Sequence, residues 1–217
     1  MILPTSSPLI LASSSPRRRE LLGHLGIPFQ IDPSNVDESP IPGLTIPELV
    51  RALATAKARE VAARHPDSVV VGADTLVDLE GEILAKPRDP ADARRMLRLL
   101  SGRVHHVHTG LAVCRANRMV TRVVTASVHM RAAPDDALAA YVAGGEPLDK
   151  AGAYAAQGEG SAFITRVEGS NLAVVGLPLL ALRELLTELG VAVPAALTIL
   201  EALERGERQE SSSPRNV

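Results

Sequence analysis

The sequence predicts an α/β fold in which a mixed, twisted and partly antiparallel sheet is flanked by helices. Strand-like and helix-like patterns alternate through most of the 217 residues, as expected for helices packed on a sheet. Residues 68–71 are a serine followed by three β-branched valines, which is typical of a strand buried on both faces. Residues 119–130 are also rich in β-branched residues, and we expect them to pair with residues 104–113.

Two helices are predicted in the first half of the chain. Pro16 suits the first turn of a helix at residues 17–25, because its missing N–H has no partner there, and Gly26 stops this helix. The Thr-Ile-Pro-Glu sequence at the start of residues 45–61 fits a helix N-terminus followed by an apolar stripe. An acidic, proline-containing loop separates the two helices.

Short strands surround these helices. The glycine of Gly72-Ala-Asp-Thr75 predicts a turn that ends one strand before the next begins. A turn at Glu80-Gly81 joins two further strands as a hairpin. The predicted strands of this half are residues 9–12, 29–31, 68–71, 76–79 and 82–84.

The second half continues the alternation. Its predicted helices are residues 91–100, 135–143 and 178–189, and its predicted strands are residues 104–113, 119–130 and 163–167. Residues 144–160 are polar and glycine-rich, and loops of that length inside a domain usually carry function or are disordered. A tight turn at Gly169-Ser-Asn171 is expected to lead into a strand at residues 174–177. Residues 204–217 are charged and serine-rich, which predicts a disordered tail after a single domain at residues 1–203, built as one lobe or as two around a cleft.

Composition excludes several classes of function. Lysine and arginine total 23 against 25 acidic residues, so no excess positive field is available to bind a nucleic-acid polymer or an acidic membrane. Aromatic residues make up only 2% of the chain, too few for a stacking platform. Cys114 is the single cysteine and fits a buried position in a reducing compartment. No apolar run is long enough to cross a bilayer, and the positive charges follow the first apolar segment, so we expect a cytoplasmic protein.

The first candidate site lies where the first strand meets the first helix. Three serines precede a helix N-terminus, whose free N–H groups and dipole favour anions. Arg17, Arg18 and Arg19 add planar guanidinium groups suited to phosphate. Because a helix turns about 100° per residue, the three cannot all face one ligand. The residues alone leave open whether this is a phosphate site or a serine-capped basic surface helix.

Other polar residues occur at separate points of the chain. Asp74 follows a buried strand, where a carboxylate can hold Mg²⁺ or orient a water molecule, although a turn aspartate that caps local N–H groups is the alternative. Lys86 precedes a proline on extended backbone and can reach towards the same place. The histidines at positions 105, 106 and 108 invite a metal site, which we disfavour because no further ligand motif accompanies them.

Taken together, the motifs resemble the Maf family of nucleoside triphosphate pyrophosphatases, also described as septum-formation inhibitors. The resemblance covers about residues 9–187. The matching motifs, in order, are Ser13-Ser-Ser15-Pro16-Arg17-Arg18, Gly72-Ala-Asp74-Thr75, Lys86-Pro87, Ser101-Gly102, Asp149-Lys150-Ala-Gly-Ala-Tyr154, Gln157-Gly158 and Val175-Gly-Leu-Pro178.

The resemblance implies a fold similar to the inosine-triphosphate pyrophosphatases (Maf/Ham1-like), a homodimer, and hydrolysis of a nucleoside triphosphate to the monophosphate and pyrophosphate. It implies a divalent metal ion, Mg²⁺ with Mn²⁺ or Co²⁺ as alternatives. The residues matching the family's phosphate-binding groups are Ser13, Arg17, Arg18, Lys57 and Lys86.

Further roles also come from the resemblance. Asp74 matches the aspartate taken as general base or metal ligand, and Glu38 matches an acidic group that helps to hold metal. Lys86 joins these two as a catalytic residue. Gln157 matches the glutamine that reads the base, and its amide can satisfy both the donor and the acceptor of a uracil-like edge.

The chain resembles the subgroup that acts on dTTP, UTP and modified pyrimidine triphosphates at Arg18, Thr75 and Gln157. The alternatives are the related subgroup that prefers 7-methyl-GTP, and a non-catalytic regulator of septum formation. Two positions depart from the family pattern: Asn171 stands where many members have an aromatic residue, and Ser14 where relatives often have glycine.

Overall fold

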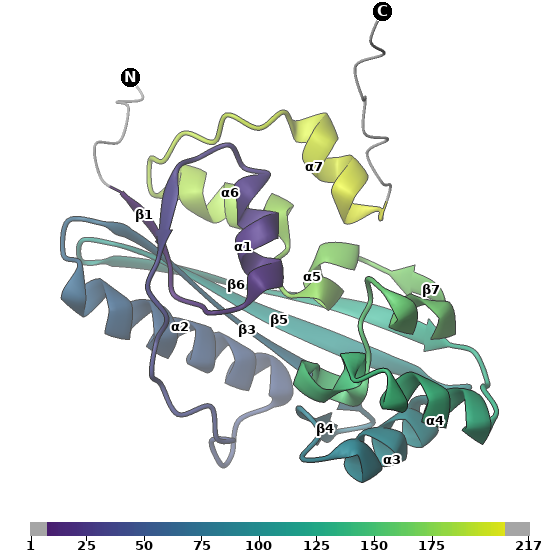
Figure 1. The fold of residues 1–217 in the computed structure, drawn as a ribbon. Coiled ribbons are helices and arrows are strands. Elements are labelled where there is room, and N and C mark those ends of the chain that lie inside the picture. Colours follow the sequence, from purple (N-terminus) through teal and green to yellow (C-terminus); the bar gives the residue numbers. More distant parts are fainter. Residues whose placement is uncertain (1–7, 207–217) are drawn as a thin grey trace, which may run out of the picture.

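The computed structural model describes residues 8–206, which form a mixed seven-stranded sheet with helices on both faces (Figure 1). This confirms the predicted α/β class. The strands are β1 (Leu9–Leu11), β2 (Phe29–Ile31), β3 (Val69–Leu79), β4 (Glu82–Leu84), β5 (Val104–Arg115), β6 (Arg118–Met130) and β7 (Ile164–Glu168). The α-helices are α1 (Pro16–Gly23), α2 (Ile46–Arg64), α3 (Pro90–Leu100), α4 (Asp135–Ala143), α5 (Asn171–Val175), α6 (Leu179–Glu188) and α7 (Leu197–Glu204).

The sheet has the order β2-β1-β3-β5-β6-β7, and β4 pairs with the far end of β3. β1 is parallel to both β2 and β3, whereas the remaining pairs are antiparallel. The pairing of β1 with β3 ends at Val71, and the pairing of β4 with β3 starts only at Val77. The segment of β3 between them is therefore an open edge within the sheet.

The predicted turn at residues 72–75 is wrong, because β3 continues through it as one strand. Glycine at position 72 serves close packing instead. A Cβ built on Gly72 would lie 2.3 Å from the carbonyl oxygen of Ala54 on α2, so only glycine lets the helix backbone lie this close to the strand. Gly110 on β5 has the same role, since a Cβ there would lie 2.3 Å from the carbonyl oxygen of Val50.

The helix N-terminus predicted at Thr45 is confirmed. The Glu48 carboxylate accepts hydrogen bonds from the backbone N–H and the hydroxyl of Thr45, at 2.9 and 2.6 Å. The buried side of α2 includes Leu49, Leu53 and Ala58. Ala58 belongs to a small apolar cluster between this helix and the sheet, together with other alanines and Cys114. This helix therefore has a fixed start and a fixed distance from β3 and β5.

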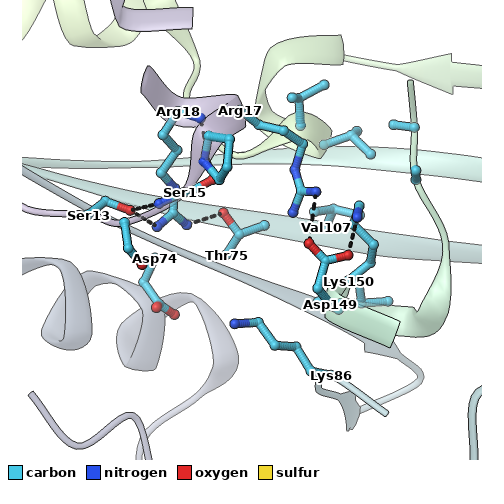
Figure 2. Close-up of a pocket in the computed structure, with 18 of the residues that line it drawn as sticks. Ser13, Ser15, Arg17, Arg18, Asp74, Thr75, Lys86, Val107, Asp149 and Lys150 are labelled. Atoms are coloured by element: carbon cyan, nitrogen blue, oxygen red, sulfur yellow. Dashed lines mark hydrogen bonds and ion pairs between the residues drawn. The ribbon is translucent and has the colours of Figure 1, made fainter. Parts of the chain in front are cut away.

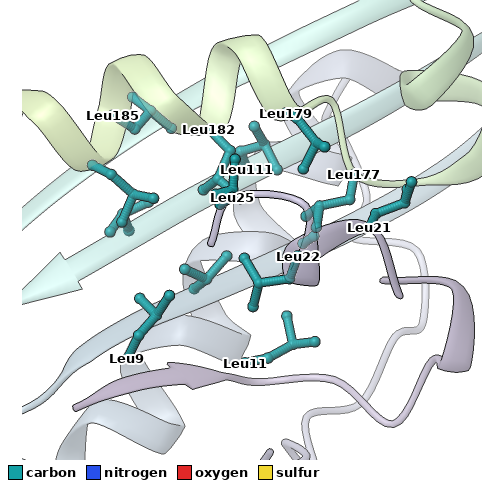
Figure 3. Packing of buried hydrophobic residues seen from close by; sticks show 14 of the residues in the cluster. Leu9, Leu11, Leu21, Leu22, Leu25, Leu111, Leu177, Leu179, Leu182 and Leu185 are labelled. Atoms are coloured by element: carbon teal, nitrogen blue, oxygen red, sulfur yellow. The ribbon is translucent and has the colours of Figure 1, made fainter. Parts of the chain in front are cut away.

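The other face of the sheet carries two larger apolar clusters. One joins β1, β3 and β5 to α1 and α6, whose leucines face one another over the strands (Figure 3). The second lies further along β3, from Val77 to Leu79, and is covered by α3, α4 and a short 3₁₀ turn. Between them, the pocket described below reaches the sheet.

The end of the chain differs from the prediction in two places. Residues 171–175 form the short helix α5 where the sequence predicted a turn into a strand, because the Ser170 hydroxyl caps the N–H of Ala173 at 2.9 Å. Glu204 was assigned to a disordered tail, but it is the last residue of α7 and is only 7% exposed. The rest of that predicted tail from residue 207 lies outside the described residues.

The loop at residues 144–160 contains 3₁₀ turns at Glu146–Asp149 and Ala151–Ala153, and a third turn at Glu159–Phe163 leads out of it. Within residues 8–206, no helix has the length and apolar character needed to span a bilayer.

Candidate active site

The pocket opens at the exposed edge of β3, beyond the carboxyl end of β1. Because this edge is unpaired from Gly72 to Leu76, side chains from both faces of the strand reach the same space, with Asp74 on one face and Thr75 on the other. Ligands in open α/β sheets commonly bind beyond the carboxyl ends of parallel strands. The structure thus corrects the predicted position of Asp74 from a turn to a strand edge, while keeping it at a ligand-binding location.

The pocket has a volume of about 290 Å³. All nine predicted site residues contribute to its lining, although they come from segments spread over 145 positions of the chain (13 to 157). Figure 2 shows six of these side chains converging from α1 and the segment before it, β3 and the segment after β4, with Asp149 and Lys150 of the loop before β7 beside them. The nine residues are Ser13, Arg17, Arg18, Glu38, Lys57, Asp74, Thr75, Lys86 and Gln157.

The serines before α1 form hydrogen bonds that fix the start of this helix. Ser15 is its N-cap, and its hydroxyl accepts from the N–H of Arg18 at 3.4 Å. The buried Ser13 hydroxyl accepts from the Ser15 N–H at 3.2 Å and from Arg18 Nη1 at 3.3 Å. The helix N-terminus therefore faces the pocket, where its dipole favours an anion. Arg19 is exposed and does not line the pocket, so the three arginines do not all face it.

Arg18 is held on three sides by protein groups. Besides Ser13, its Nε donates to the carbonyl oxygen of Gly176 at 3.0 Å, and its Nη2 donates to Thr75 Oγ1 at 3.1 Å. Three of its five N–H bonds are thereby used, and the other two remain for a ligand. Burial lowers the pKa of Arg18, and the nearby charges of Asp74 and Glu38 partly offset this.

Thr75 is oriented in turn by Thr109, which is fully buried on β5. The Thr109 hydroxyl donates to the carbonyl oxygen of Ala173 at 2.7 Å, and the hydroxyls of Thr75 and Thr109 lie 2.9 Å apart. Because a hydroxyl has one hydrogen, Thr109 accepts from Thr75, and Thr75 accepts from Arg18. The Thr75 oxygen therefore faces the pocket as an acceptor.

Two carboxylates and one ammonium form the other side of the pocket. Lys57 Nζ lies 2.6 Å from Asp74 Oδ1 and 2.6 Å from Glu38 Oε1. The side chains of Lys57 and Asp74 are only 6% and 7% exposed, whereas that of Glu38 is 57% exposed. Partial burial alone would raise the pKa of Glu38, but the hydrogen bond from Lys57 and the charges of Lys86 and Arg18 lower it overall.

The loop that precedes β7 closes the pocket opposite α1. Arg17 Nη1 lies 3.6 Å from Asp149 Oδ2, and the Lys150 ammonium contacts the same carboxylate. Lys86 extends into the space beside Asp74 (Figure 2). The exposed Gln157 side chain makes no hydrogen bond within the described part of the chain, so its amide is available to a ligand.

Two of the three histidines at which the sequence disfavoured a metal site are held by hydrogen bonds to other side chains. Among residues 8–206, no group of three or more histidine, cysteine, aspartate or glutamate side chains could hold a metal ion. His105 is buried and hydrogen-bonds the Tyr154 hydroxyl at 2.8 Å, while His108 contacts Thr125 at 2.8 Å and Asp78 at 3.3 Å.

Several residues that shape the pocket were not among the predicted site residues. Asp149, Lys150 and Tyr154 line it, and all three belong to a motif that the sequence had singled out without assigning roles. Thr109 had no sequence signal, since a lone threonine in a strand looks like any β-branched residue. Asn171 is not a lining residue: its amide donates to the carbonyl oxygen of Glu204 at 3.2 Å, which links this departure from the family pattern to α7.

Comparison with known proteins supports the resemblance. The family model described as Maf-like protein matches residues 8–189. A dTTP/UTP pyrophosphatase of Moorella thermoacetica is 54% identical over 190 residues, covering 86% of this chain and 97% of that protein. Proteins of the same name from Syntrophus aciditrophicus and Myxococcus xanthus are 44% and 47% identical, covering 93% and 86% of this chain and 98% and 94% of the relatives.

Among solved structures, a nucleoside-triphosphatase / dITP/XTP pyrophosphatase from Mycobacterium abscessus has a TM-score of 0.39 and 16% identity, covering 58% of this chain and 76% of that one. This likeness is too remote to add to the assignment. The match across residues 8–189, together with relatives of this identity that are covered almost completely, means that the chain belongs to the Maf family.

Proposed function

We propose that this protein is a nucleoside triphosphate pyrophosphatase that hydrolyses dTTP and UTP to the monophosphate and pyrophosphate. The observation that carries the proposal is a pocket at a helix N-terminus whose lining brings together five cationic side chains and three carboxylates. The names of the relatives, at 44–54% identity, support the same substrates.

The charges of the pocket suit a triphosphate. At neutral pH such a ligand carries about four negative charges, which require several fixed cations. Arg17, Lys57 and Lys86 lie around the space, and Arg18 keeps two N–H bonds for phosphate oxygens. When a phosphate binds, Arg17 exchanges its 3.6 Å contact with the exposed Asp149 for the ligand.

Asp74 is the proposed general base. Lys57 holds its Oδ1, and no described residue hydrogen-bonds its Oδ2, which is left to accept a proton from water. The water oxygen then forms a bond to the α-phosphorus, and the bond from that phosphorus to the bridging oxygen breaks. The electron pair leaves with pyrophosphate, whose developing charge Lys86 and Arg17 stabilise.

The residues present fit a divalent metal ion. Glu38 and Asp74 bracket a cation already, since Lys57 lies 2.6 Å from an oxygen of each. One or two carboxylates, completed by substrate phosphates, form a common protein site for Mg²⁺. Glu38 and Asp74 would hold the ion, which supplies further charge neutralisation at the phosphates when bound. Mn²⁺ and Co²⁺ remain alternatives to Mg²⁺.

Base recognition is assigned to Gln157, and the Thr75 oxygen offers a further acceptor in the same pocket. The glutamine amide presents one donor and one acceptor, which match the carbonyl and N–H of a uracil or thymine edge. We also propose that this protein forms a homodimer and that it is located in the cytoplasm.

The function is tested by measuring pyrophosphate release from dTTP, UTP, 5-methyl-UTP, CTP and 7-methyl-GTP with Mg²⁺ or Mn²⁺. We expect dTTP and UTP to be the preferred substrates. A folded sample that releases pyrophosphate from none of them would contradict the enzyme function, and preference for 7-methyl-GTP would reassign the substrate.

The role of Asp74 is tested by Asp74→Asn. This change keeps the shape of the side chain but removes the proton acceptor, so we expect kcat to fall by at least about a hundredfold. Asp67→Asn, at an exposed position just before β3, is the control and should leave kcat unchanged. Wild-type turnover in Asp74→Asn, with the melting temperature preserved, would remove Asp74 from this role.

A further inference from the structure

The Gln157 segment has no regular secondary structure to fix its position. Gln157 lies between the 3₁₀ turns that end at Ala153 and begin at Glu159, and its side chain is exposed. The backbone on either side must therefore determine where the amide points. Each side is attached to one of two side chains that hydrogen-bond each other, Tyr141 on α4 and Glu146 in the first 3₁₀ turn.

Glu146 binds the backbone that follows Gln157. Its Oε1 accepts from the N–H of Glu159 at 3.2 Å, and its Oε2 accepts from the N–H of Gly160 at 2.9 Å. Hydrogen bonds to an ionised acceptor are stronger than neutral ones. Burial alone would raise the pKa of Glu146, but the hydrogen bonds from Tyr141, Gly160 and Glu159 lower it, so they stabilise the charged form.

Tyr141 binds the backbone that precedes Gln157. Its hydroxyl accepts from the N–H of Ala155 at 3.1 Å and donates to Glu146 Oε2 at 2.7 Å. The ring is 5% exposed and packs against Phe163 with centroids 5.2 Å apart, so the hydroxyl has a fixed position.

Two glycines lie against Glu146 and Tyr141, at positions where a side chain would not fit. Gly158 has φ +109°, a conformation that favours glycine, and a Cβ there would lie 2.2 Å from Glu146 Oε1. A Cβ on Gly160 would lie 2.5 Å from the Tyr141 hydroxyl oxygen. The turn after Gln157 therefore closes directly onto the carboxylate and the phenol.

We propose that Glu146, with Tyr141, is a positioning residue for base recognition, because the pair fixes the backbone on both sides of Gln157. Glu146 is not among the pocket-lining residues, so it acts through the loop and not by touching the nucleotide. The proposal rests on the proposed function in one respect: it takes Gln157 to be the residue that reads the base.

The experiment combines amide hydrogen exchange with steady-state kinetics on Glu146→Ala and the milder Tyr141→Phe, which keeps the ring contact with Phe163. Glu159→Gln is the matched control, because it removes a charge from the same loop without removing an acceptor from the pair. We expect exchange at residues 155–160 to accelerate by about tenfold or more in the two test variants, and to stay unchanged in the control.

In Glu146→Ala and Tyr141→Phe, we expect KM for dTTP to rise about tenfold, because a charge-assisted hydrogen bond is lost. We also expect the preference of these two variants for dTTP over CTP to shrink. The value of kcat at saturating dTTP should change little, because the pair does not touch Asp74 or Lys57. A purely structural role would lower the melting temperature without changing the substrate preference.

Unchanged exchange at residues 155–160 overturns the proposal, as does faster exchange with an unaltered preference for dTTP over CTP. If the wild-type protein hydrolyses none of the triphosphates, the proposed function fails separately. Hydrogen exchange then still decides whether the pair fixes this segment.

Discussion

Arg18 connects the start of α1 to three other parts of the pocket. Its hydrogen bonds to Ser13, Thr75 and Gly176 use one N–H from each guanidinium nitrogen, so the side chain is oriented before any ligand arrives. Arg17 is different, because its only ion pair with another residue of 8–206 is a 3.6 Å contact with an exposed aspartate. The two adjacent arginines thus combine a fixed phosphate-facing group with one that can exchange partners.

His105 is another residue whose environment has a measurable consequence. It is 1% exposed, and burial lowers its pKa from 6.5 to about 4. In the unfolded chain, His105 therefore takes up a proton near pH 6.5, whereas in the folded protein it takes up this proton only near pH 4. The stability that depends on neutral His105 is complete above pH 6.5 and is lost as the pH falls towards 4.

We expect His105→Gln, which can still hydrogen-bond Tyr154 but does not titrate, to reduce the acid sensitivity of folding. Between pH 7 and pH 4.5 the wild type should lose about 2 kcal/mol more unfolding free energy than this variant, a magnitude that follows from the pKa difference. Urea denaturation at the two pH values measures this, with the exposed His106→Gln as control. Equal losses in wild type and His105→Gln would contradict it.

At the scale of elements, the contact of α2 with β3 and β5 decides the geometry of the catalytic groups. Gly72 and Gly110 let the helix backbone lie directly on the strands, and Lys57 of this helix then reaches Asp74 on β3 at 2.6 Å. A larger residue at either glycine would push the helix away. The absence of a side chain at these two glycines therefore sets the distance of α2 from β3 and β5.

Gly72→Ala is therefore expected to lower both stability and turnover. The added Cβ would meet the Ala54 carbonyl at 2.3 Å and the Ala58 nitrogen at 2.8 Å, so α2 must shift. Overpacking of this kind costs about 1–3 kcal/mol, and displacement of Lys57 should reduce kcat as well. Chemical denaturation and dTTP hydrolysis measure the two effects. Gly23→Ala, where a Cβ meets nothing within 4 Å, is the control; equal stability of the two variants would contradict the role of Gly72.

At the scale of the whole molecule, the chain beyond the family match contributes to the fold. The match ends at residue 189, yet α7 places Leu200 in the largest apolar cluster and Glu204 against two other helices. The Glu204 carboxylate accepts from the Leu180 N–H at 3.1 Å, at the start of α6, and from the Ser170 hydroxyl that caps α5. Since α5 leads to Gly176, α7 supports the segment that holds Arg18.

Glu204→Ala should consequently destabilise the protein, because it leaves donors at the starts of α5 and α6 without their acceptor. The expected loss is about 1–3 kcal/mol of unfolding free energy. Glu188→Ala, at an exposed position of α6, should cost far less. Denaturation of both variants measures the difference. If the two melt alike, α7 does not support α5 and α6 in this way.

The sequence predicted most elements for local reasons. The capping pattern at Thr45, Pro16 at a helix start and the β-branched runs each reflect physics that acts within a few residues. The errors occurred where distant segments decide the outcome. Gly72 looked like a turn residue because its packing partner on α2 is not visible in the local sequence, and Glu204 looked like part of a charged tail because its partners lie on α5 and α6.

The sequence by itself determined the α/β class, the position of the anion-binding helix start and, through its resemblance to the Maf family, the set of residues proposed for the site. The single-domain organisation, the homodimer and the cytoplasmic location stay predictions. Only the tertiary structure decided how the site is assembled: the open edge of β3, the bracketing of Lys57 by Glu38 and Asp74, and the attachment of the Gln157 segment to Tyr141 and Glu146. These features depend on contacts between segments far apart in the chain, which local patterns do not encode.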